Sequence, residues 1–314
     1  DNAHYKHLLA LNTGRNALLY LIRAKDIRKI YIPYYLCDSV SNMLQQHGCS
    51  FYYYHIDANF NPIFNQSLEE NAFLYVVNYY GQLENAMIES LKQRYERIIV
   101  DNTQAFFQEP VSGVDTIYSC RKFFGVPDGA YLSTDSVLDD DLAIDVSKDR
   151  MGHILGRYEG SASEYYDRFQ ENDASFRFEP LEYMSKLTRN ILGAIDYDAV
   201  RRIREQNYAY LQKMLGALNR LIITSPPGPF AYPFYLENGV AIRRHLAEKR
   251  IYVPTLWPNV SRGEPDGSLE RDYATNILPL PCDQRYSIGD MEYMVRHIQH
   301  VVEHFCETSS KMPL

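Results

Sequence analysis

The sequence predicts an α/β protein with a mainly parallel central sheet, followed by a smaller α+β unit. Two observations lead to this prediction. Short apolar runs alternate with amphipathic runs through the first half of the chain, and the pattern becomes acidic and irregular from about residue 140. Strands separated by helices are joined by right-handed crossovers, which makes neighbouring strands parallel. We therefore expect a large α/β domain over residues 1–175 and a small α+β domain over residues 176–314.

The first half is expected to begin with a helix over residues 11–27, with Asn12 or Thr13 available to cap it. Further elements follow from apolar runs that end at turn residues. They are a strand at 29–33, a helix at 38–48, strands at 50–56 and 72–81, a helix at 84–95, a strand at 97–101, and two short strands within 113–119 and 129–134. The loop between the last two strands carries Lys122.

The second half is expected to contain fewer strands. A polar, helix-prone segment continues to about residue 172. The expected elements after it are a long amphipathic helix at 194–221, a strand at 230–236, a helix at 241–250, a strand at 251–257 and a final helix from about 288. This αβαβα order is the basis for the predicted small domain.

Composition excludes several classes of function. The formal net charge of −8 and the lack of a basic run argue against a nucleic-acid partner. No apolar run approaches membrane-spanning length, so no membrane partner is expected. The cysteines at positions 37, 49, 120, 282 and 306 are scattered and lack a C-x-x-C spacing. This pattern indicates reduced thiols in a cytoplasmic protein rather than a disulfide framework or a zinc site.

The stretch "LNTGRNAL" is the first candidate site. Gly14 lies in a small turn just before a helix, where free backbone N–H groups and the positive end of the helix dipole meet. Such a turn can bind phosphate. The alternative is an ordinary capped helix with a glycine in its turn.

The stretch "ERIIVDNTQAFF" is the second candidate. Its apolar strand ends in Asp101, which places a carboxylate at the edge of the sheet where open α/β proteins bind ligands. Gln104 could reach the same ligand from the following turn. The alternative is that Asp101 only caps that turn.

The stretch "YSCRKFFGVPDGAYL" is the third candidate, because Lys122 follows a buried strand. Burial and the neighbouring Arg121 would lower the pKa of its amine, and Ser119 offers a hydroxyl for phosphate. The alternative is a solvated loop charge. Pyridoxal phosphate needs a Schiff-base lysine, a carboxylate for its ring nitrogen and a phosphate site, and the three stretches supply these parts together.

These stretches resemble the DegT/DnrJ/EryC1/StrS family of pyridoxal-phosphate aminotransferases over nearly the whole chain. "NTGRNAL" is similar to the family's Ser-Gly-Thr-x-Ala-Leu phosphate turn, and "DNTQAF" to its Asp-x-x-Gln/His stretch. "YSCRKFFGVPDGA" resembles its lysine loop, and "ILPLPCDQRYSIGDMEYMV" its closing segment before the last helix. The resemblance implies fold type I, with a large pyridoxal-phosphate-binding domain and a shared active site in a homodimer.

The resemblance also implies roles for single residues. Lys122 would be the Schiff-base and proton-transfer residue, Asp101 would pair with the pyridinium nitrogen, and Gln104 would lie on the ring hydroxyl side. Phosphate would be held by Thr13, Gly14, Arg15 and Ser119. Arg15 replaces the family's usual threonine, and only two residues separate Ser119 from Lys122.

Other positions come from the same resemblance with alternatives left open. Tyr35 or Cys37 would stack on the cofactor ring. Arg189 or Asn190 would reach the site of a partner subunit, and Trp257 would either line the substrate pocket or belong to the core.

The resemblance implies transfer of an amino group from a donor such as glutamate to a keto acceptor, with a nucleotide-linked keto-sugar as the family's acceptor. One alternative is a pyridoxal-phosphate lyase or dehydratase, although the family's dehydratases carry histidine in place of the lysine. Another is a non-catalytic regulatory or scaffold protein, and a third is an α/β protein without pyridoxal phosphate. No metal site is expected, because His297, His300 and His304 have no carboxylate or cysteine at ligand spacing.

Overall fold

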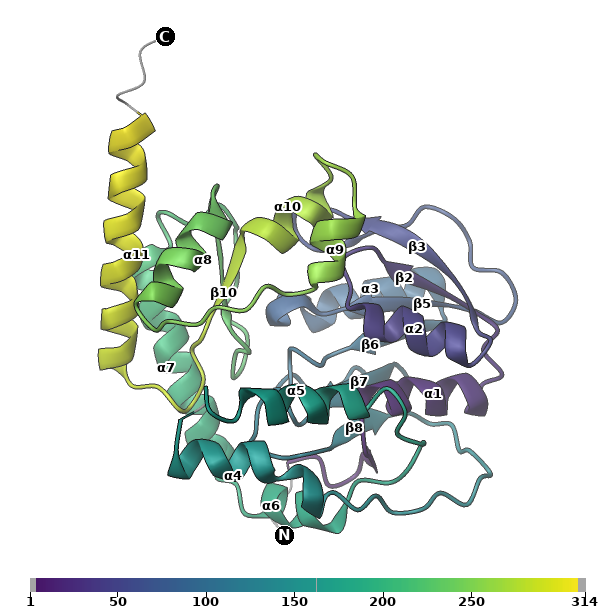
Figure 1. The fold of residues 1–314 in the computed structure, drawn as a ribbon. Coiled ribbons are helices and arrows are strands. Elements are labelled where there is room, and N and C mark those ends of the chain that lie inside the picture. The colour runs from purple at the N-terminus through teal and green to yellow at the C-terminus, as the bar shows by residue number, and fades with distance from the viewer. Residues whose placement is uncertain (1–3, 162, 310–314) are drawn as a thin grey trace.

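The computed structural model describes residues 4–161 and 163–309, with side chains described up to Glu303. Its main feature is an eight-stranded sheet in the order β1-β8-β7-β6-β5-β2-β3-β4 (Figure 1). The strands are β1 (Leu9–Leu11), β2 (Lys29–Pro33), β3 (Ser50–Ile56), β4 (Pro62–Ile63), β5 (Ala72–Val77), β6 (Ile98–Asp101), β7 (Asp115–Ser119) and β8 (Ala130–Ser133). The five strands from β7 to β3 in this order are parallel, while β1, β8 and β4 pair antiparallel. The predicted fold class, a mainly parallel sheet flanked by helices, is confirmed.

Helices connect and cover these strands. They are α1 (Gly14–Ala24), α2 (Asp38–Gln46), α3 (Asn85–Tyr95), α4 (Gly152–Glu159), α5 (Tyr166–Ser175), α6 (Lys186–Gly193), α7 (Tyr197–Leu215), α8 (Gly239–Glu248), α9 (Pro258–Gly263), α10 (Leu269–Asn276) and α11 (Ile288–Ser309). Strand β5 ends earlier than expected, because residues 79–81 form a short 3₁₀ turn. No helix in the described ranges is long and apolar enough to cross a membrane.

The second half contains a two-stranded antiparallel sheet of β9 (Tyr232–Tyr235) and β10 (Ile277–Leu280), packed beside α7, α8 and α11 (Figure 1). The strand expected at residues 251–257 is wrong, since this segment is irregular. Pro254 has no N–H to give a ladder, and Trp257 adopts a left-handed backbone with φ 58°. The partner of β9 is therefore β10, which follows α10 instead.

Apolar contacts cross the predicted boundary near residue 175. The core of the large sheet includes Val260, Tyr273 and Ala274 from α9 and α10. Leu192 and Tyr197 pack with aromatic residues around the lysine loop in a separate cluster. The two predicted domains thus share packed surfaces, and the division at residue 175 stays a prediction.

Candidate active site

Asp101 ends β6 and lies at the carboxyl edge of the central sheet. Its side chain is buried, and Oδ2 accepts a hydrogen bond from the Tyr75 hydroxyl at 2.7 Å while Oδ1 accepts one from the Thr103 N–H at 2.8 Å. The neighbouring strand β7 runs parallel with Asp101 opposite Ile117, so β7 ends at the same edge two residues later. Ligands of open α/β sheets bind at this edge.

The loop that carries Lys122 is held by hydrogen bonds at both of its ends. Cys120 N donates to Gly129 O at 3.0 Å, which closes the loop across β7 and β8. The carbonyl of Phe123 accepts from Arg204 Nη2 at 3.1 Å and from Gln284 Nε2 at 2.8 Å. Arg204 is a buried residue of α7, so the second half of the chain fixes the backbone beside Lys122.

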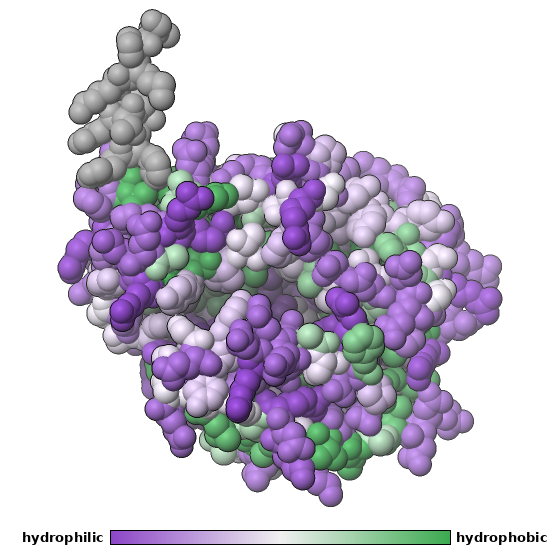
Figure 2. Space-filling view, in the orientation of Figure 1, coloured by the Kyte–Doolittle hydropathy of each residue, from purple (hydrophilic) through white to green (hydrophobic). Residues whose placement is uncertain are grey.

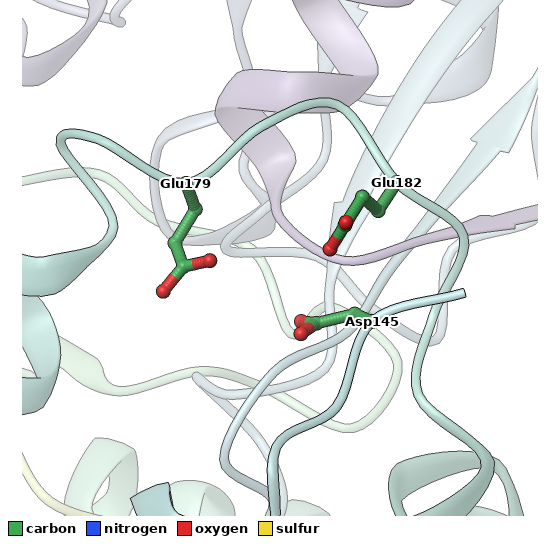
Figure 3. A group of neighbouring side chains, drawn as sticks. All are labelled: Asp145, Glu179 and Glu182. Atoms are coloured by element: carbon green, nitrogen blue, oxygen red, sulfur yellow. The ribbon is translucent and has the colours of Figure 1, made fainter. Parts of the chain in front are cut away.

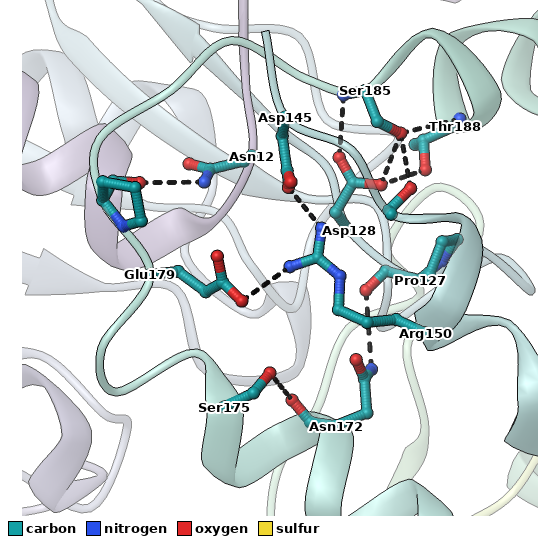
Figure 4. Close-up of polar contacts among 12 residues, drawn as sticks. Asn12, Pro127, Asp128, Asp145, Arg150, Asn172, Ser175, Glu179, Ser185 and Thr188 are labelled. Atoms are coloured by element: carbon teal, nitrogen blue, oxygen red, sulfur yellow. Dashed lines mark hydrogen bonds and ion pairs between the residues drawn. The ribbon is translucent and has the colours of Figure 1, made fainter. Parts of the chain in front are cut away.

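Asp128 fixes the other side of the same loop. Its buried carboxylate accepts hydrogen bonds from Ser185 N at 2.9 Å, from Ser185 Oγ at 2.8 Å and from the Thr188 hydroxyl (Figure 4). Ser185 caps α6, so the carboxylate lies where the helix dipole favours negative charge. Gly129 follows with φ 113°, a conformation that side chains rarely adopt. The Pro-Asp-Gly sequence of the loop is therefore required for its anchoring.

The amine of Lys122 lies next to the turn after β6. Its Nζ donates to Thr103 Oγ1 at 2.8 Å. Burial lowers the pKa of Lys122 and the charge of Arg121 lowers it further, while Asp101 and Cys37 oppose the shift. By surface area, however, Lys122 is exposed. A side chain that is surrounded by protein but reached by solvent has both properties. Figure 2 shows a hollow in the molecule, in the area between α5, α8 and α10.

The start of α1 abuts the same turn. A side-chain carbon added at Gly14 would lie 3.7 Å from Thr103 Cγ2, an ordinary contact, so space alone does not require glycine here. The Thr13 hydroxyl accepts from Asn16 N at 3.0 Å and is thus occupied as the helix cap. Arg15 is half-buried and makes no hydrogen bond or ion pair with a described residue.

Arg121 adds a second cation, which the sequence analysis considered only for its effect on Lys122. Its guanidinium lies 4.0 Å from the ring centroid of Phe176 and 3.4 Å from Asp173 Oδ1. Burial lowers the pKa of Arg121 to about 10, Asp173 opposes this, and the charge of Arg15 adds to it. Two arginines whose charges repel each other, with one carboxylate paired to Arg121, favour a bound anion. An arginine directly before the lysine was the available sequence signal.

Gln104 and Ser119, both predicted to contact the cofactor, differ in whether the side chain already has a hydrogen-bond partner. Gln104 is buried, and its Oε1 accepts from Tyr80 N at 2.8 Å, which supports a Tyr80 backbone with φ 55°. Ser119 is half-buried at the end of β7, and its hydroxyl makes no hydrogen bond with a described residue. Ser119 therefore has a free donor at the site, and Gln104 has one amide oxygen already engaged.

The structure separates the two predicted stacking residues. Tyr35 is fully buried, its ring lies 4.6 Å from that of Trp257, and its hydroxyl faces that of Tyr80 without reaching hydrogen-bond geometry. Cys37 is half-buried at the start of α2, and its proximity opposes the lowering of the pKa of Lys122. Of the two residues, Cys37 is thus the one coupled to the lysine. Trp257 packs edge-on against Tyr35 and Tyr79.

Arg189 and Asn190 are exposed on α6, and their side chains make no hydrogen bond or ion pair with a described residue of this chain. Their placement leaves them available to a second subunit.

No protein-family model matches the sequence, and no curated protein is similar to it. Solved structures are similar in fold. NtdA from Bacillus subtilis with bound cofactor PMP has a TM-score of 0.68 at 13% identity, covering 95% of this chain and 74% of its own. The sugar aminotransferase CalS13 from Micromonospora echinospora has a TM-score of 0.61 at 12% identity, covering 93% and 87%. A DegT DnrJ EryC1 StrS aminotransferase from Brucella abortus has a TM-score of 0.59 at 13% identity, covering 94% and 86%. The chain has the fold of these aminotransferases.

In this aminotransferase fold, one turn collects the central predicted residues. Thr103 contacts Lys122 and Asp101 by hydrogen bonds and faces Gly14. Thr103 lies inside the stretch "DNTQAF", and its hydroxyl was the signal that the sequence analysis did not use.

A group of three carboxylates lies apart from this site. Oxygen atoms of Asp145, Glu179 and Glu182 lie within 4.8 Å of one another (Figure 3). The guanidinium of Arg150 pairs with Asp145 at 2.5 Å and with Glu179 at 3.0 Å (Figure 4). Burial and the two neighbouring carboxylates raise the pKa of Glu182. A cation from the chain itself thus pairs with two of the three carboxylates, and these ion pairs join the segments around residues 145 and 180.

Two histidines of α11 lie near a histidine of α8. The ring centroids of His297 and His300 are each 6.4 Å from that of His245 on α8. The side chain of His304 lies outside the described residues. The carboxylate trio is the one group in the described part of the chain with ligand atoms close enough for a metal.

Proposed function

We propose that this chain is a pyridoxal-phosphate-dependent aminotransferase. The observation that supports it most directly is the amine of Lys122, whose pKa is lowered by burial and which lies at the sheet edge beside Asp101. A lowered pKa increases the neutral fraction of an amine at any given pH, and the neutral form is the nucleophile. When bound, pyridoxal phosphate would supply an aldehyde for amines and a ring that accepts electrons.

The residues present fit this cofactor. Lys122 offers the amine and Asp101 a buried carboxylate, each of whose oxygens accepts one hydrogen bond and can accept another. Arg15, Arg121 and the N–H groups at the start of α1 offer positive charge for a phosphate. The Ser119 hydroxyl would join them. Thr13 would contribute through its backbone, because its side chain caps the helix.

Two residues would carry the proton chemistry. Asp101 would hold a proton on the ring nitrogen by charge, which keeps the ring able to accept electrons. Lys122 Nζ would take a proton from the substrate carbon and return it, as its lowered pKa suits a general base near neutral pH. Gln104 would contact the ring from the turn after β6.

We propose an amino acid such as glutamate as donor and a nucleotide-linked keto-sugar as acceptor. The similar fold of CalS13, which is described as a sugar aminotransferase, supports this choice. A homodimer with shared sites is part of the proposal. Exposed apolar side chains gather between Val137 and Phe178, and Arg189 and Asn190 are free on α6. We also propose a reducing, cytoplasmic setting, since the four cysteines described are unpaired.

The test is the visible absorbance of the protein with added pyridoxal phosphate, before and after borohydride. We expect a visible band that borohydride abolishes, with a pyridoxyl group then found on Lys122 by mass spectrometry. Lys122→Ala should show no band, whereas Lys186→Ala, which removes an exposed lysine on α6, should keep it. Absence of the band in the wild type would overturn the proposal.

A second step separates an aminotransferase from a lyase or a non-catalytic protein. Glutamate added to the loaded wild type should convert the visible band to the near-ultraviolet band of the amine form of the cofactor, with release of 2-oxoglutarate. A visible band that no amino acid changes would indicate a binding protein instead.

A further inference from the structure

We propose that Thr103 is a positioning residue for Lys122, holding one N–H of its amine so that the nitrogen lone pair is directed at an incoming carbonyl. This inference rests on the proposed function. Lysine has a flexible four-carbon stem and loses side-chain entropy when held in one geometry. An exposed lysine that must react in one direction therefore needs a local acceptor, and Thr103 Oγ1 at 2.8 Å is that acceptor.

Thr103 is fixed by three separate contacts. Its N–H donates to Asp101 Oδ1 at 2.8 Å, so its backbone is tied to the carboxylate. Its methyl carbon Cγ2 faces the start of α1 at Gly14. Its hydroxyl oxygen receives the amine of Lys122. The first hydrogen bond holds the backbone of Thr103 and the methyl group lies near the start of α1, which leaves the hydroxyl oxygen to hold the lysine.

The arrangement links the amine to the carboxylate through a single residue. Asp101 ends β6 and Lys122 lies in the loop after the adjacent parallel strand β7, and Thr103, in the turn after β6, bonds to both. A neutral amine has two N–H groups and one lone pair. Donation of one N–H to Thr103 leaves the lone pair available, whereas a bond that accepted from a donor would consume it.

The hydroxyl also affects protonation. An acceptor stabilises the charged amine, so it keeps the pKa of Lys122 higher than burial alone would leave it. Removal of the hydroxyl should therefore lower the pKa of Lys122 and, at the same time, leave the amine without a fixed direction. These two effects oppose each other in reactivity near neutral pH, and a pH profile separates them.

Two variants divide the side chain into its parts. Thr103→Val keeps the methyl group and the volume but removes the acceptor. Thr103→Ser keeps the acceptor but removes the methyl group that faces Gly14. The apoprotein would be methylated with formaldehyde and cyanoborohydride over a pH series, and modification of Lys122 measured by peptide mass spectrometry. Lys186 in the same digest is the internal control, as an exposed lysine on another element.

In Thr103→Val we expect the midpoint of the Lys122 profile to fall by about one pH unit, the size of one hydrogen bond to a charged group. The rate of uptake of pyridoxal phosphate at high pH, where the amine is neutral in all variants, should fall about tenfold in Thr103→Val. Thr103→Ser should match the wild type in both, and the profile of Lys186 should not move. Urea midpoints check that each variant is folded.

Coinciding Lys122 profiles in wild type and Thr103→Val would overturn the inference. A Thr103→Ser variant that behaves like Thr103→Val would overturn it too, because the methyl contact would then be the cause. If the wild type forms a visible band with pyridoxal phosphate while the profiles coincide, the inference fails alone. If the wild type forms no band, the proposed function fails, and the role of Thr103 fails with it.

Discussion

The hydroxyl of Tyr75 donates a 2.7 Å hydrogen bond to Asp101 Oδ2, which joins β5 and β6 at the carboxyl edge of the sheet. Burial raises the pKa of Tyr75 well above its usual value, and the charge of Asp101 adds to the shift. Tyr75 therefore stays a neutral donor near neutral pH. The carboxylate is held in place by β5, a strand that contains none of the predicted site residues.

Replacing Tyr75 by Phe should weaken both the fold and the binding of pyridoxal phosphate. Loss of a hydrogen bond to a charged group costs about 1.5–3 kcal/mol, measured here as a fall in the free energy of unfolding in urea. Tyr54→Phe is the matched control, because Tyr54 OH donates to the backbone carbonyl of Tyr75 at 2.7 Å and does not reach the carboxylate. That control should lose stability but keep its affinity for the cofactor. Equal affinities in all three proteins would contradict the prediction.

The two arginines near the site should be specific for the phosphate group. Arg15→Ala and Arg121→Ala should each weaken pyridoxal phosphate by about 10–100-fold, the range for one charged hydrogen bond. Their affinity for pyridoxal, which has no phosphate, should be unchanged. Arg23→Ala is the control, since Arg23 lies in the last turn of α1 and pairs with Asp140. A parallel loss for pyridoxal would show a structural role instead.

Gly129→Ala should unfold the lysine loop. The new methyl carbon would lie 3.0 Å from Thr188 Cγ2 and 3.2 Å from Cys120 Cβ, at a φ of 113°. Strain of this kind costs about 1–3 kcal/mol for the backbone and a similar amount for the clash. Gly113 also has a positive φ, 71°, but a methyl carbon added there would meet no atom within 4 Å. Gly113→Ala should therefore cost only the free energy of the backbone strain. Urea unfolding of both variants compares the two costs, and equal losses would show that the clash is relieved.

Cys37 should be the most readily alkylated of the four cysteines whose side chains are described, because Cys49, Cys120 and Cys282 are buried. Iodoacetamide should modify it and block the visible band with pyridoxal phosphate, since the thiol is coupled to Lys122. Bound cofactor should protect it. Cys37→Ser should keep the band and resist the reagent. Full uptake of cofactor by the alkylated protein would place Cys37 away from the cofactor.

Periodicity predicted the inner strands of the central sheet but missed the two strands at its edges, β1 and β4, which have only three and two residues. The strands ending at Asp101 and Ser119 are continuous apolar runs, as buried parallel strands are, and the helices between them repeat apolar residues at helical spacing. The strand predicted at 251–257 was wrong. This segment has the composition of a strand, but Pro254 has no N–H to donate and Trp257 has a left-handed backbone. Strand β10 depends on pairing with a distant segment, which local pattern does not contain.

The site was predicted as separate stretches, each named for the residue that does chemistry. What holds those residues was not predicted, because Tyr75, Arg204 and Asp128 act through contacts distant in sequence. Thr103 was not predicted either, although it lies only two positions from Asp101, because its contact with Lys122 appears only in the folded structure.

The buried guanidinium of Arg204 connects α7, the carbonyl of Pro229, Gln284 and the carbonyl of Phe123. Phe123 is the residue after Lys122, so we expect α7 and the backbone beside the reactive amine to move together. Any opening and closing of the site must then occur elsewhere than between α7 and the lysine loop. The carboxyl-terminal part of the chain thus stabilises the backbone that carries the amine. A change that speeds amide hydrogen exchange in α7 should therefore speed it in the lysine loop as well.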